Sequence, residues 1–494
     1  MDDEPEHGVR SEDLTPPSDR RAAGVRPSGP TPISAGPHLV LVTAGTAGDM
    51  YPFLYLARGL LARGHRVSFL GPVAHAGVAA AAGVPFVGLG TEADYLAALD
   101  DPDLWHPRRG FEVIWRHVFP GLTSLPQWFA KLPADEACAL LAHPVALPAA
   151  ALVRAARPGL RVVAAWLAPN NLRTVHDQMV WGPLHVPRWM PAGWRHALWR
   201  IADARIVDNV SLPSLNGVRA AAGLPAVDHF VDHMHSVADA SLALFPPWFA
   251  PTVPDWPAGL HEGAFPLYDP SPDAPFDDVL EAFLTAGDDD APRKPIVFTP
   301  GSGNRQAARW FERALAATGR LGRRAIFLTP HRAQVPTRLP TDVLWHPYVP
   351  LRRLLPRVAA LVHHGGIGTT AEALRAGVPQ IVVPLAFDQF DNGVRLEALG
   401  VGRRREGWGT RPRGLARAIE ALLGEPATRV ACERAAARVA EDARVDLVDI
   451  AESLLLGSPG SGLRPDPGIQ LPVTAMREES QDARRWNAGV RSKT

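Results

Sequence analysis

A strand–turn–helix–strand pattern in residues 361–392 constrains the fold of this chain more than any other feature. The segment reads LVHHGGIGTTAEALRAGVPQIVVPLAFDQFDN, and its apolar start is typical of a buried parallel strand. A glycine-rich turn follows, then a helix that ends at Gly377-Val378-Pro379, and Gln380 to Val383 predicts the next strand. The pattern therefore predicts a β-α-β unit and an α/β fold with a parallel sheet.

The turn in this unit has the composition of an anion site. Its glycines have no Cβ and let a phosphate approach the backbone; they are Gly365, Gly366 and Gly368. They precede a helix N-terminus, where unpaired N–H groups and the helix dipole favour negative charge. His364 and Thr369 add donors, and Glu372 lies where it can accept hydrogen bonds from a ribose. Such a turn can also serve packing alone, but its combination with Asp388 and Gln389 in one unit favours a nucleotide-diphosphate cradle.

A second glycine turn, Gly45 to Asp49, follows the apolar run Leu39 to Val42. Its match to a dinucleotide-binding turn is weak, because G-x-G-x-x-G is incomplete and no acidic residue follows the second predicted strand at Leu70. Asp49 is expected at the carboxyl end of a strand, where open α/β sheets bind ligands. A carboxylate there can take a proton from a hydroxyl or cap the following helix, and the two roles can coexist.

Both segments resemble the motifs of nucleotide-sugar glycosyltransferases, the family that holds plant and sterol glucosyltransferases and glycopeptide and macrolide glycosyltransferases. H-G-G-x-G-T-x-x-E, G-x-P and P-x-x-x-D-Q match between His364 and Gln389, and G-[ST]-x-G-D-x-x-P matches from Gly45 to Pro52. The resemblance implies the GT-B fold, in which two Rossmann-like doubly wound domains face each other across a cleft. It also implies that Asp49 is the catalytic base.

The resemblance further implies a set of donor contacts. Ser302, in the loop Thr299 to Gly303, is expected near a phosphate, and the backbone at Val349 is expected near the nucleobase. Asp388 and Gln389 match the positions that contact sugar hydroxyls. The other expected donor-binding residues are His364, Gly365, Gly366, Gly368, Thr369 and Glu372. No cofactor and no metal is implied, because the helix end supplies positive potential to the diphosphate.

Within the family, Asp101 to Trp105 and Phe245 to Pro251 look like parts of the rhamnosyltransferases of rhamnolipid synthesis, a branch beside the sterol glucosyltransferases. That branch lacks an acidic residue where this chain has Glu372. A carboxylate there can bind both ribose hydroxyls, so we expect a UDP-sugar in preference to dTDP-rhamnose. The expected acceptor is a small lipophilic molecule: a lipid, a hydroxy fatty acid, a sterol or a natural product.

The 494 residues divide into five expected segments. They are a disordered tail (1–36), an acceptor-binding Rossmann-like domain (37–245), an interdomain connection that contains the acidic run 288–290 (246–294), a donor-binding Rossmann-like domain with closing helices (295–456) and a second disordered tail (457–494). The closing helices are expected at 411–423 and 429–455. Both glycine turns would then lie at the carboxyl ends of strands, on the two sides of the cleft.

Net charge, cysteine spacing and apolar runs bear on which binding partners and which location are expected. The chain has 51 basic and 51 acidic residues, which gives no electrostatic argument for nucleic-acid binding. Its two cysteines, Cys138 and Cys432, have no metal or redox spacing. The N-terminus is polar and charged, and no long uncharged apolar run is present, so a cytoplasmic location is expected. Oligomeric state is not predicted.

A tryptophan- and arginine-rich stretch, residues 181–200, is the main feature that the motifs do not explain. Trp181 and Trp189 are expected to form a wall of the acceptor site. Amphipathic aromatic and basic segments can also lie on a membrane surface, so peripheral contact with the inner face of a membrane is the alternative for this stretch.

The sequence as a whole predicts an inverting hexosyltransferase that moves a sugar from a nucleotide diphosphate to a hydroxyl group. Two alternatives stay open at this point. One is a nicotinamide-dependent Rossmann oxidoreductase, and the other is a non-catalytic protein that binds a sugar nucleotide.

Overall fold

The computed structural model describes residues 36–286, 294–406 and 410–457, which belong to one compact unit. The two predicted tails lie outside the described residues, apart from Gly36 and Gly457 at their inner ends, and so does the acidic run 288–290. Within the described ranges, no helix combines the length and the apolar character needed to cross a membrane.

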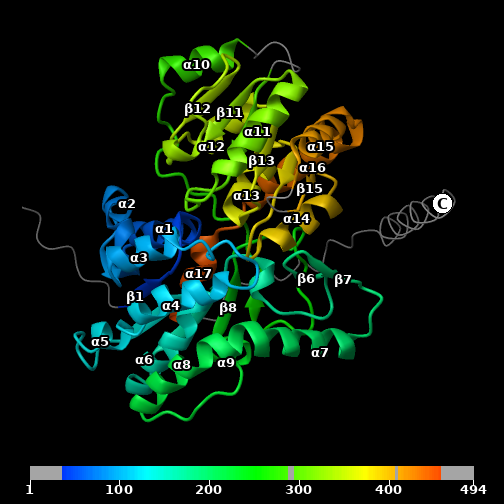
Figure 1. Ribbon diagram of the computed structural model, residues 1–494. Coiled ribbons are helices and arrows are strands. Elements are labelled where there is room, and N and C mark those ends of the chain that lie inside the picture. Colours follow the sequence, from blue (N-terminus) through cyan, green and yellow to red (C-terminus); the bar gives the residue numbers. More distant parts are fainter. Residues whose placement is uncertain (1–35, 287–293, 407–409, 458–494) are drawn as a thin grey trace, which may run out of the picture. The chain divides into compact units, whose positions relative to one another are not determined.

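The first of two large sheets forms the N-terminal lobe (Figure 1). Its strands run parallel in the order β3-β2-β1-β4-β5-β8-β9. The strands are β1 (His38–Val42), β2 (Val67–Pro72), β3 (Phe86–Leu89), β4 (Cys138–Ala142), β5 (Arg161–Trp166), β8 (Ala240–Ala243) and β9 (Leu260–His261). Leu39 and Leu41 of β1 enter one core, whereas Val40 and Val42 enter another. Both faces of the sheet are therefore covered, which explains why β1 is apolar throughout.

Helices and a small hairpin surround this sheet. The helices are α1 (Ala47–Ala62), α2 (Ala76–Ala81), α3 (Glu92–Asp100), α4 (Gly110–Leu122), α5 (Leu125–Phe129), α6 (Leu147–Ala156), α7 (Ala192–Ala202), α8 (Asn209–Ala221) and α9 (Phe230–Val237). An antiparallel hairpin of β6 (Met179–Trp181) and β7 (Leu184–Val186) precedes α7. A π-helical stretch, Asp203–Asp208, joins α7 to α8 without a loop.

The second sheet forms the C-terminal lobe, with parallel strands in the order β12-β11-β10-β13-β14-β15. The strands are β10 (Ile296–Thr299), β11 (Ala325–Leu328), β12 (Val343–His346), β13 (Ala360–His363), β14 (Gln380–Val382) and β15 (Gly402–Arg404). The helices of this lobe are α10 (Asp278–Thr285), α11 (Ala308–Leu321), α12 (Leu351–Leu354), α13 (Ile367–Ala376), α14 (Gln389–Ala398), α15 (Pro412–Gly424) and α16 (Pro426–Asp442). The final helix, α17 (Leu447–Leu456), returns to the first lobe.

Strand order reverses direction at β1/β4 in the first sheet and at β10/β13 in the second. Open α/β sheets bind ligands beyond the carboxyl ends of the strands at such switch points. The loops that leave β1, β10 and β13 are the ones that carry Asp49, Ser302 and the glycine turn at 365–368. The doubly wound topology of both sheets agrees with the fold class that the sequence predicts.

The last part of the chain departs from the sequence prediction. The expected single helix at 429–455 is two helices, α16 and α17, because Asp446 caps a new helix by accepting hydrogen bonds from the N–H groups of Val448 and Asp449. Helix α17 packs into a core of the N-terminal lobe rather than closing the C-terminal lobe. A Cβ on Gly59 of α1 would lie 2.3 Å from a Val448 methyl carbon, so this glycine allows the close approach.

Two elements of the N-terminal lobe also differ from expectation. The apolar run at 137–153 contains strand β4, which pairs with β1 and which the sequence pattern does not predict. Helix α1 begins at Ala47, within the glycine turn that the sequence predicts at Gly45 to Asp49, because Thr46 and Asp49 together form a capping box. Asp49 is therefore inside the first turn of a helix.

Candidate active site

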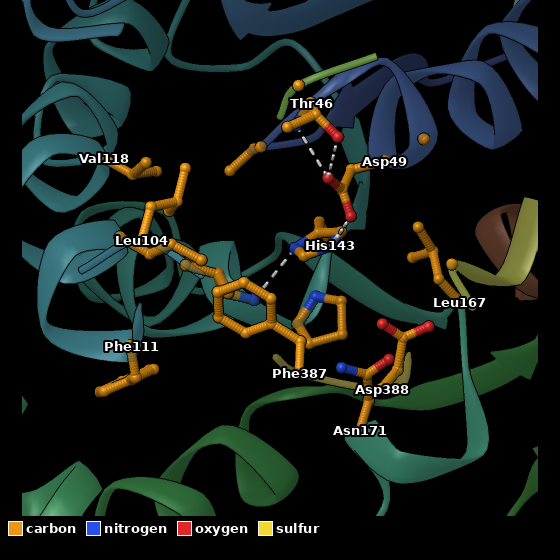
Figure 2. Close-up of a pocket in the computed structure, with 18 of the residues that line it drawn as sticks. Thr46, Asp49, Leu104, Phe111, Val118, His143, Leu167, Asn171, Phe387 and Asp388 are labelled. Atoms are coloured by element: carbon orange, nitrogen blue, oxygen red, sulfur yellow. Dashed lines mark hydrogen bonds and ion pairs between the residues drawn. The ribbon is translucent and has the colours of Figure 1, made fainter. Parts of the chain in front are cut away.

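Asp49 occupies the third position of helix α1, directly after strand β1. Its Oδ2 accepts hydrogen bonds from the backbone N–H of Thr46 at 2.8 Å and from the Thr46 hydroxyl at 3.3 Å. Figure 2 shows that the other carboxylate oxygen, Oδ1, is turned away from Thr46 and toward His143. One oxygen thus serves the helix while the second can face a ligand, so capping and proton transfer are compatible at this residue.

His143 is the closest ionisable partner of Asp49 among the described residues. It directly follows β4, the strand beside β1, and its Nε2 lies 3.7 Å from Asp49 Oδ1. Its Nδ1 accepts a hydrogen bond from the backbone N–H of Val145 at 3.2 Å. Because an accepting Nδ1 carries no proton, the proton of the neutral ring is assigned to Nε2, which faces Asp49. At 3.7 Å this contact is longer than a hydrogen bond, so His143 is a polar neighbour of Asp49 Oδ1 and leaves that oxygen open to a ligand.

Gly45 allows the carboxylate to take this position. Its φ is 110°, in the region that disfavours side chains, and a Cβ there would lie 2.3 Å from Asp49 Oδ2. Any larger residue would therefore push the Asp49 carboxylate away from its bond with Thr46.

On the opposite lobe, the turn after β13 leads into α13 with Gly366 as the N-cap residue. Gly366 supplies no side-chain cap, so the start of α13 is open to an anion. A Cβ on Gly366 would lie 2.5 Å from His364 Nε2, and one on Gly301 would lie 2.9 Å from His364 Cε1. The His364 ring is therefore held between the two glycine turns that follow β10 and β13.

The two adjacent histidines of this turn are both uncharged at neutral pH. Burial lowers the pKa of His364 to about 4, and burial with the neighbouring His364 ring lowers the pKa of His363 to about 3. His363 is fully buried, where its ring contacts Gln380 Oε1 at 3.0 Å and accepts the N–H of Gly365 at 3.2 Å. His363 thus shapes the turn from behind, while His364 lines the cavity as a neutral donor.

Asp388 and Gln389 begin helix α14 on the same side of the site. Gln389 Oε1 accepts the N–H groups of Leu385 and Ala386 at 2.8 and 3.1 Å, which leaves the Gln389 amide NH₂ for a ligand. Asn392 donates to the carbonyl of Gly365 at 2.8 Å and to Asp388 Oδ2 at 2.7 Å. These bonds join the glycine turn and the Asp-Gln loop into one rigid unit.

The Asp388 carboxyl has an unusual protonation equilibrium. Burial raises its pKa to about 7, with a further contribution from the negative charge of Asp49 and an opposing one from the bond to Asn392. Asp49 and Asp388 line the same cavity from the two lobes. At neutral pH the site therefore holds one carboxylate that Thr46 stabilises and a second that ionises only in part.

A cavity of about 460 Å³ lies between these groups. Its polar walls include most of the predicted site residues: Asp49, Ser302, His364, Gly366, Gly368, Thr369, Asp388 and Gln389. Its apolar end lies in the N-terminal lobe and includes Leu104, Phe111, Ile114, Val118, Phe230 and Met234. Figure 2 shows Leu104, Phe111 and Val118 together on the side opposite Leu167. A volume of this size suits a drug-sized ligand.

Three predicted donor residues lie outside the wall of this cavity. Gly365 turns toward the sheet, where a Cβ would lie 2.6 Å from Val382 Cγ1, so packing rather than phosphate access requires a glycine. The Val349 side chain is buried in the C-terminal core, which leaves only its backbone for a nucleobase. Glu372 Oε2 accepts hydrogen bonds from Nε and Nη2 of Arg375 at 2.9 and 2.8 Å, which leaves Oε1 for a ribose.

The two tryptophans expected in the acceptor wall separate in the structure. Trp181 lines the cavity. Trp189 does not, and its side chain is 81% exposed on the outer surface. The expectation for Trp189 is therefore corrected: hairpin β6–β7 turns the chain outward between the two residues.

Phe387 is a site residue that sequence reasoning missed. It is the only residue other than glycine with positive φ in the described part of the chain, at 58°. Its ring leaves the C-terminal lobe and packs edge-on to Trp105 of the N-terminal lobe, with 6.0 Å between the ring centroids. Positive φ is strained for a bulky residue, so this contact holds the conformation in place. Phe387 thereby places an aromatic ring in the cavity wall beside Asp388.

His143 was also missed, although a weak signal exists. A histidine that ends an apolar run is expected at a strand's carboxyl end, and such ends meet at one edge of a parallel sheet. Because β4 itself was not predicted, no pattern in the chain placed His143 beside β1. For Phe387 no sequence signal exists, since backbone strain is not visible in residue types.

Comparison with known proteins agrees with this geometry. Residues 39–161 match the glycosyltransferase family 28 N-terminal domain, and residues 312–454 match the erythromycin biosynthesis protein CIII-like C-terminal domain. The glycotransferase of kitacinnamycin superposes with a TM-score of 0.64 at 20% identity, covering 85% of this chain and 99% of that one. A spinosyn rhamnosyltransferase complexed with thymidine diphosphate gives a TM-score of 0.54 at 21% identity over 82% and 96% of the two chains. These two structures share the fold.

Sequence relatives establish the family. Glycosyltransferase GtfE of Amycolatopsis orientalis is 31% identical over 83% of this chain and 96% of its own length. An O-mycaminosyltylonolide 6-deoxyallosyltransferase of Streptomyces fradiae is 29% identical over 83% and 95%. A sterol 3-beta-glucosyltransferase of Aspergillus oryzae is 47% identical, but over only 15% of this chain. The closeness to the rhamnolipid branch stays a prediction. The two doubly wound lobes and the uncapped helix start across the cavity from Asp49 agree with these relatives, which align along most of this chain. The chain is therefore a member of the nucleotide-sugar glycosyltransferase family of GT-B fold.

Proposed function

We propose that this enzyme transfers a hexose, with inversion, from a nucleotide-diphosphate sugar to a hydroxyl group of a lipophilic natural product. The observation that carries the proposal is the single cavity with the free Oδ1 of Asp49 on one side and the open start of α13 on the other. A proton acceptor and an anion site that face each other are the two parts that a direct displacement at an anomeric carbon requires.

In the proposed reaction, the acceptor oxygen attacks the anomeric carbon from the face opposite the diphosphate. The acceptor's proton passes to Asp49, and the electron pair of the breaking carbon–oxygen bond leaves with the diphosphate. His143 Nε2 faces this carboxylate at 3.7 Å, which is beyond hydrogen-bond distance. The N–H groups at the start of α13 and the neutral His364 take up the negative charge that develops on the departing oxygen. The proposal needs no metal or cofactor, because these preorganised dipoles act on the leaving group.

For the donor, we favour a UDP-sugar over dTDP-rhamnose. The support for this choice is Glu372. Arg375 bonds only its Oε2, so its Oε1 can accept hydrogen bonds from ribose hydroxyls. A deoxyribose has one hydroxyl fewer to offer, and one such contact is worth about 1–3 kcal/mol. The relatives include both a vancomycin aglycone glucosyltransferase and a dTDP-epi-vancosaminyltransferase, so the transferred sugar varies among them, and the nucleotide has to be measured here.

For the acceptor, the apolar end of the cavity supports a molecule with a large hydrophobic body that presents a hydroxyl to Asp49. The relatives act on a tylonolide and on a vancomycin aglycone, which are natural products of this general kind. Family membership decides against the nicotinamide-dependent oxidoreductase. The free oxygen of Asp49 favours an enzyme over a non-catalytic sugar-nucleotide binder.

The proposal is tested in two stages with the full chain. Thermal shift with UDP, dTDP and GDP first ranks the nucleotides, and a larger shift with dTDP than with UDP would overturn the role given to Glu372. Candidate macrolide and polyketide aglycones are then incubated with the preferred donor class, in buffer with and without EDTA. We expect a product heavier by one hexose, with the anomeric configuration opposite to that of the donor by NMR, and no loss of rate with EDTA. Retention of configuration would contradict the mechanism.

A further inference from the structure

Large hydrophobic side chains gather on the outer surface of hairpin β6–β7 and helix α7. Among the described residues, eight large hydrophobic side chains are exposed, and four of them lie between residues 184 and 201. These four form what we call the outer patch: Leu184 at 55%, Trp189 at 81%, Trp194 at 70% and Ile201 at 47% exposure. Figure 1 shows α7 and the hairpin at the margin of the N-terminal lobe. Clustered exposed apolar residues mark interaction sites far more than single ones do.

The outer patch rests on a firmly packed support. On the inner face of α7, Arg195 donates to the carbonyls of Val175 and Asp177, and Trp199 Nε1 donates to the carbonyl of Thr174 at 2.9 Å. The Arg173 guanidinium lies 4.1 Å from the centroid of the Trp199 ring. Helical spacing then turns Trp194 and Ile201, seven residues apart, to the opposite face. The exposure of these residues follows from the helix register and not from poor packing.

The chain segment that carries the outer patch contains arginines but no acidic residue. No Asp or Glu occurs from residue 178 to residue 202, whereas Arg188, Arg195 and Arg200 fall within this range. The side chains of Arg188 and Arg200 are 69% and 42% exposed. Arg188 reaches Asp177 only at 4.0 Å, while Arg200 pairs with Asp232 at 2.8 Å. Exposed tryptophans beside Arg188, whose carboxylate neighbour Asp177 is buried, are complementary to the headgroup region of an anionic bilayer.

The outer patch is also continuous with the cavity. Val180, Trp181 and Gly182 line the cavity, and Leu184 of the outer patch follows two residues later in the same hairpin. One face of this short segment thus touches the site while the next residues face outward. A surface bound at the outer patch would therefore lie next to this wall of the cavity.

We propose that the outer patch docks this enzyme on an anionic lipid surface. Trp189, Trp194, Leu184 and Ile201 enter the headgroup–acyl boundary, and Arg188 meets lipid phosphates. Docking places one wall of the cavity beside a phase in which lipophilic molecules concentrate. This inference stands independently of the donor and of the acceptor proposed above, because it rests on the outer surface alone.

The test is vesicle flotation of the full chain with phosphatidylcholine vesicles, with or without about 30% phosphatidylglycerol. We expect flotation with the anionic vesicles that weakens in about 0.5 M NaCl. The double variant Trp189→Ser, Trp194→Ser should lower the bound fraction about tenfold. The matched control is Val279→Ser, Val430→Ser, which removes two exposed apolar side chains, 65% and 50% exposed, from α10 and α16 of the other lobe. It should float like the wild type.

Two further measurements test the role of charge and the folding of the variants. Arg188→Gln should reduce flotation with anionic vesicles and leave the weak binding to neutral vesicles unchanged. Unchanged UDP binding in every variant shows that the variants are folded. The proposal is overturned if the wild type does not float, or if the double tryptophan variant floats as well as the control. It is equally overturned if the wild type dimerises through the outer patch instead, seen as a dimer in sedimentation velocity that the double variant abolishes.

Discussion

The two lobes contain the same local unit, a parallel strand, a glycine turn and a helix, but they use the helix start in opposite ways. In the β1–α1 unit the first turn of the helix is occupied by Asp49, whose Oδ2 accepts the N–H of Thr46 at 2.8 Å. In the β13–α13 unit the N-cap is Gly366, and no side chain caps the helix. Both units line the same cavity.

The difference shows how one supersecondary unit acquires two functions. A helix start that already holds a carboxylate repels a phosphate, and the carboxylate it holds is fixed well enough to act as a base. A helix start without a cap keeps its N–H groups for a ligand. In the proposed reaction, the presence or absence of one internal acidic side chain therefore distinguishes the lobe that takes the acceptor's proton from the lobe that takes the diphosphate.

Asp49→Asn should give the largest effect that bears on this comparison. The amide oxygen can still accept the Thr46 N–H, so the fold is kept, but the group no longer takes a proton. We expect kcat to fall roughly 100- to 10,000-fold, with UDP affinity by titration calorimetry unchanged. Near-normal turnover would show that another residue is the base.

Gly368→Ala and Gly48→Ala compare the second helical position of the two units directly. A Cβ on Gly368 would meet no protein atom within 4 Å, and one on Gly48 would meet only Thr46 Oγ1 at 3.8 Å. Neither change is expected to unfold the protein, and each should favour its helix. We expect Gly368→Ala to weaken UDP binding about tenfold, or about 1.4 kcal/mol, and Gly48→Ala to leave it unchanged. Equal losses in both would refute the contrast between the two helix starts.

His143→Leu should lower kcat several-fold, because Asp49 loses the polar neighbour that faces its free oxygen at 3.7 Å. His143→Gln keeps an N–H donor near the same place and should restore most of the rate, a rescue that a purely structural role would not predict. Steady-state kinetics at saturating donor is the measurement. A loss as large as that of Asp49→Asn, without rescue, would instead identify His143 as the base.

Asp388→Asn should change stability in a pH-dependent way. The folded-state pKa of about 7 is above the ordinary value, so the folded chain holds this proton more tightly than the unfolded chain does. Stability is therefore highest when the carboxyl is protonated and declines as pH rises through the interval up to about 7. The asparagine removes that cost. A rise in pKa from 3.8 to about 7 corresponds to about 4 kcal/mol, so we expect a stability gain of roughly 2–4 kcal/mol at pH 8 and little gain near pH 4. Thermal unfolding at the two pH values measures it; an equal gain at both would contradict the raised pKa.

Much of the architecture could be predicted from the sequence. Apolar runs that alternate with glycine turns identify β1, β10, β11 and β13 closely, since a strand buried on both faces has to be apolar along its length. The motif residues also gather as expected, because Asp49, Ser302, His364 and Asp388 follow strands whose carboxyl ends meet. The errors lie where long-range packing overrides local pattern: β4, the break before α17, and the outward turn between Trp181 and Trp189.

The α/β class, the two glycine turns and the chemical types at the site follow from residue order alone, since they depend on local spacing and on residues that few other folds require. The folded chain was needed to show that Asp49 keeps one oxygen free, that His143 stands beside it and that Phe387 is held at positive φ. It was also needed to show that α17 packs on the N-terminal lobe. These features share one cause: they arise from contacts between segments far apart in the chain, and their energies exist only once both sheets are packed.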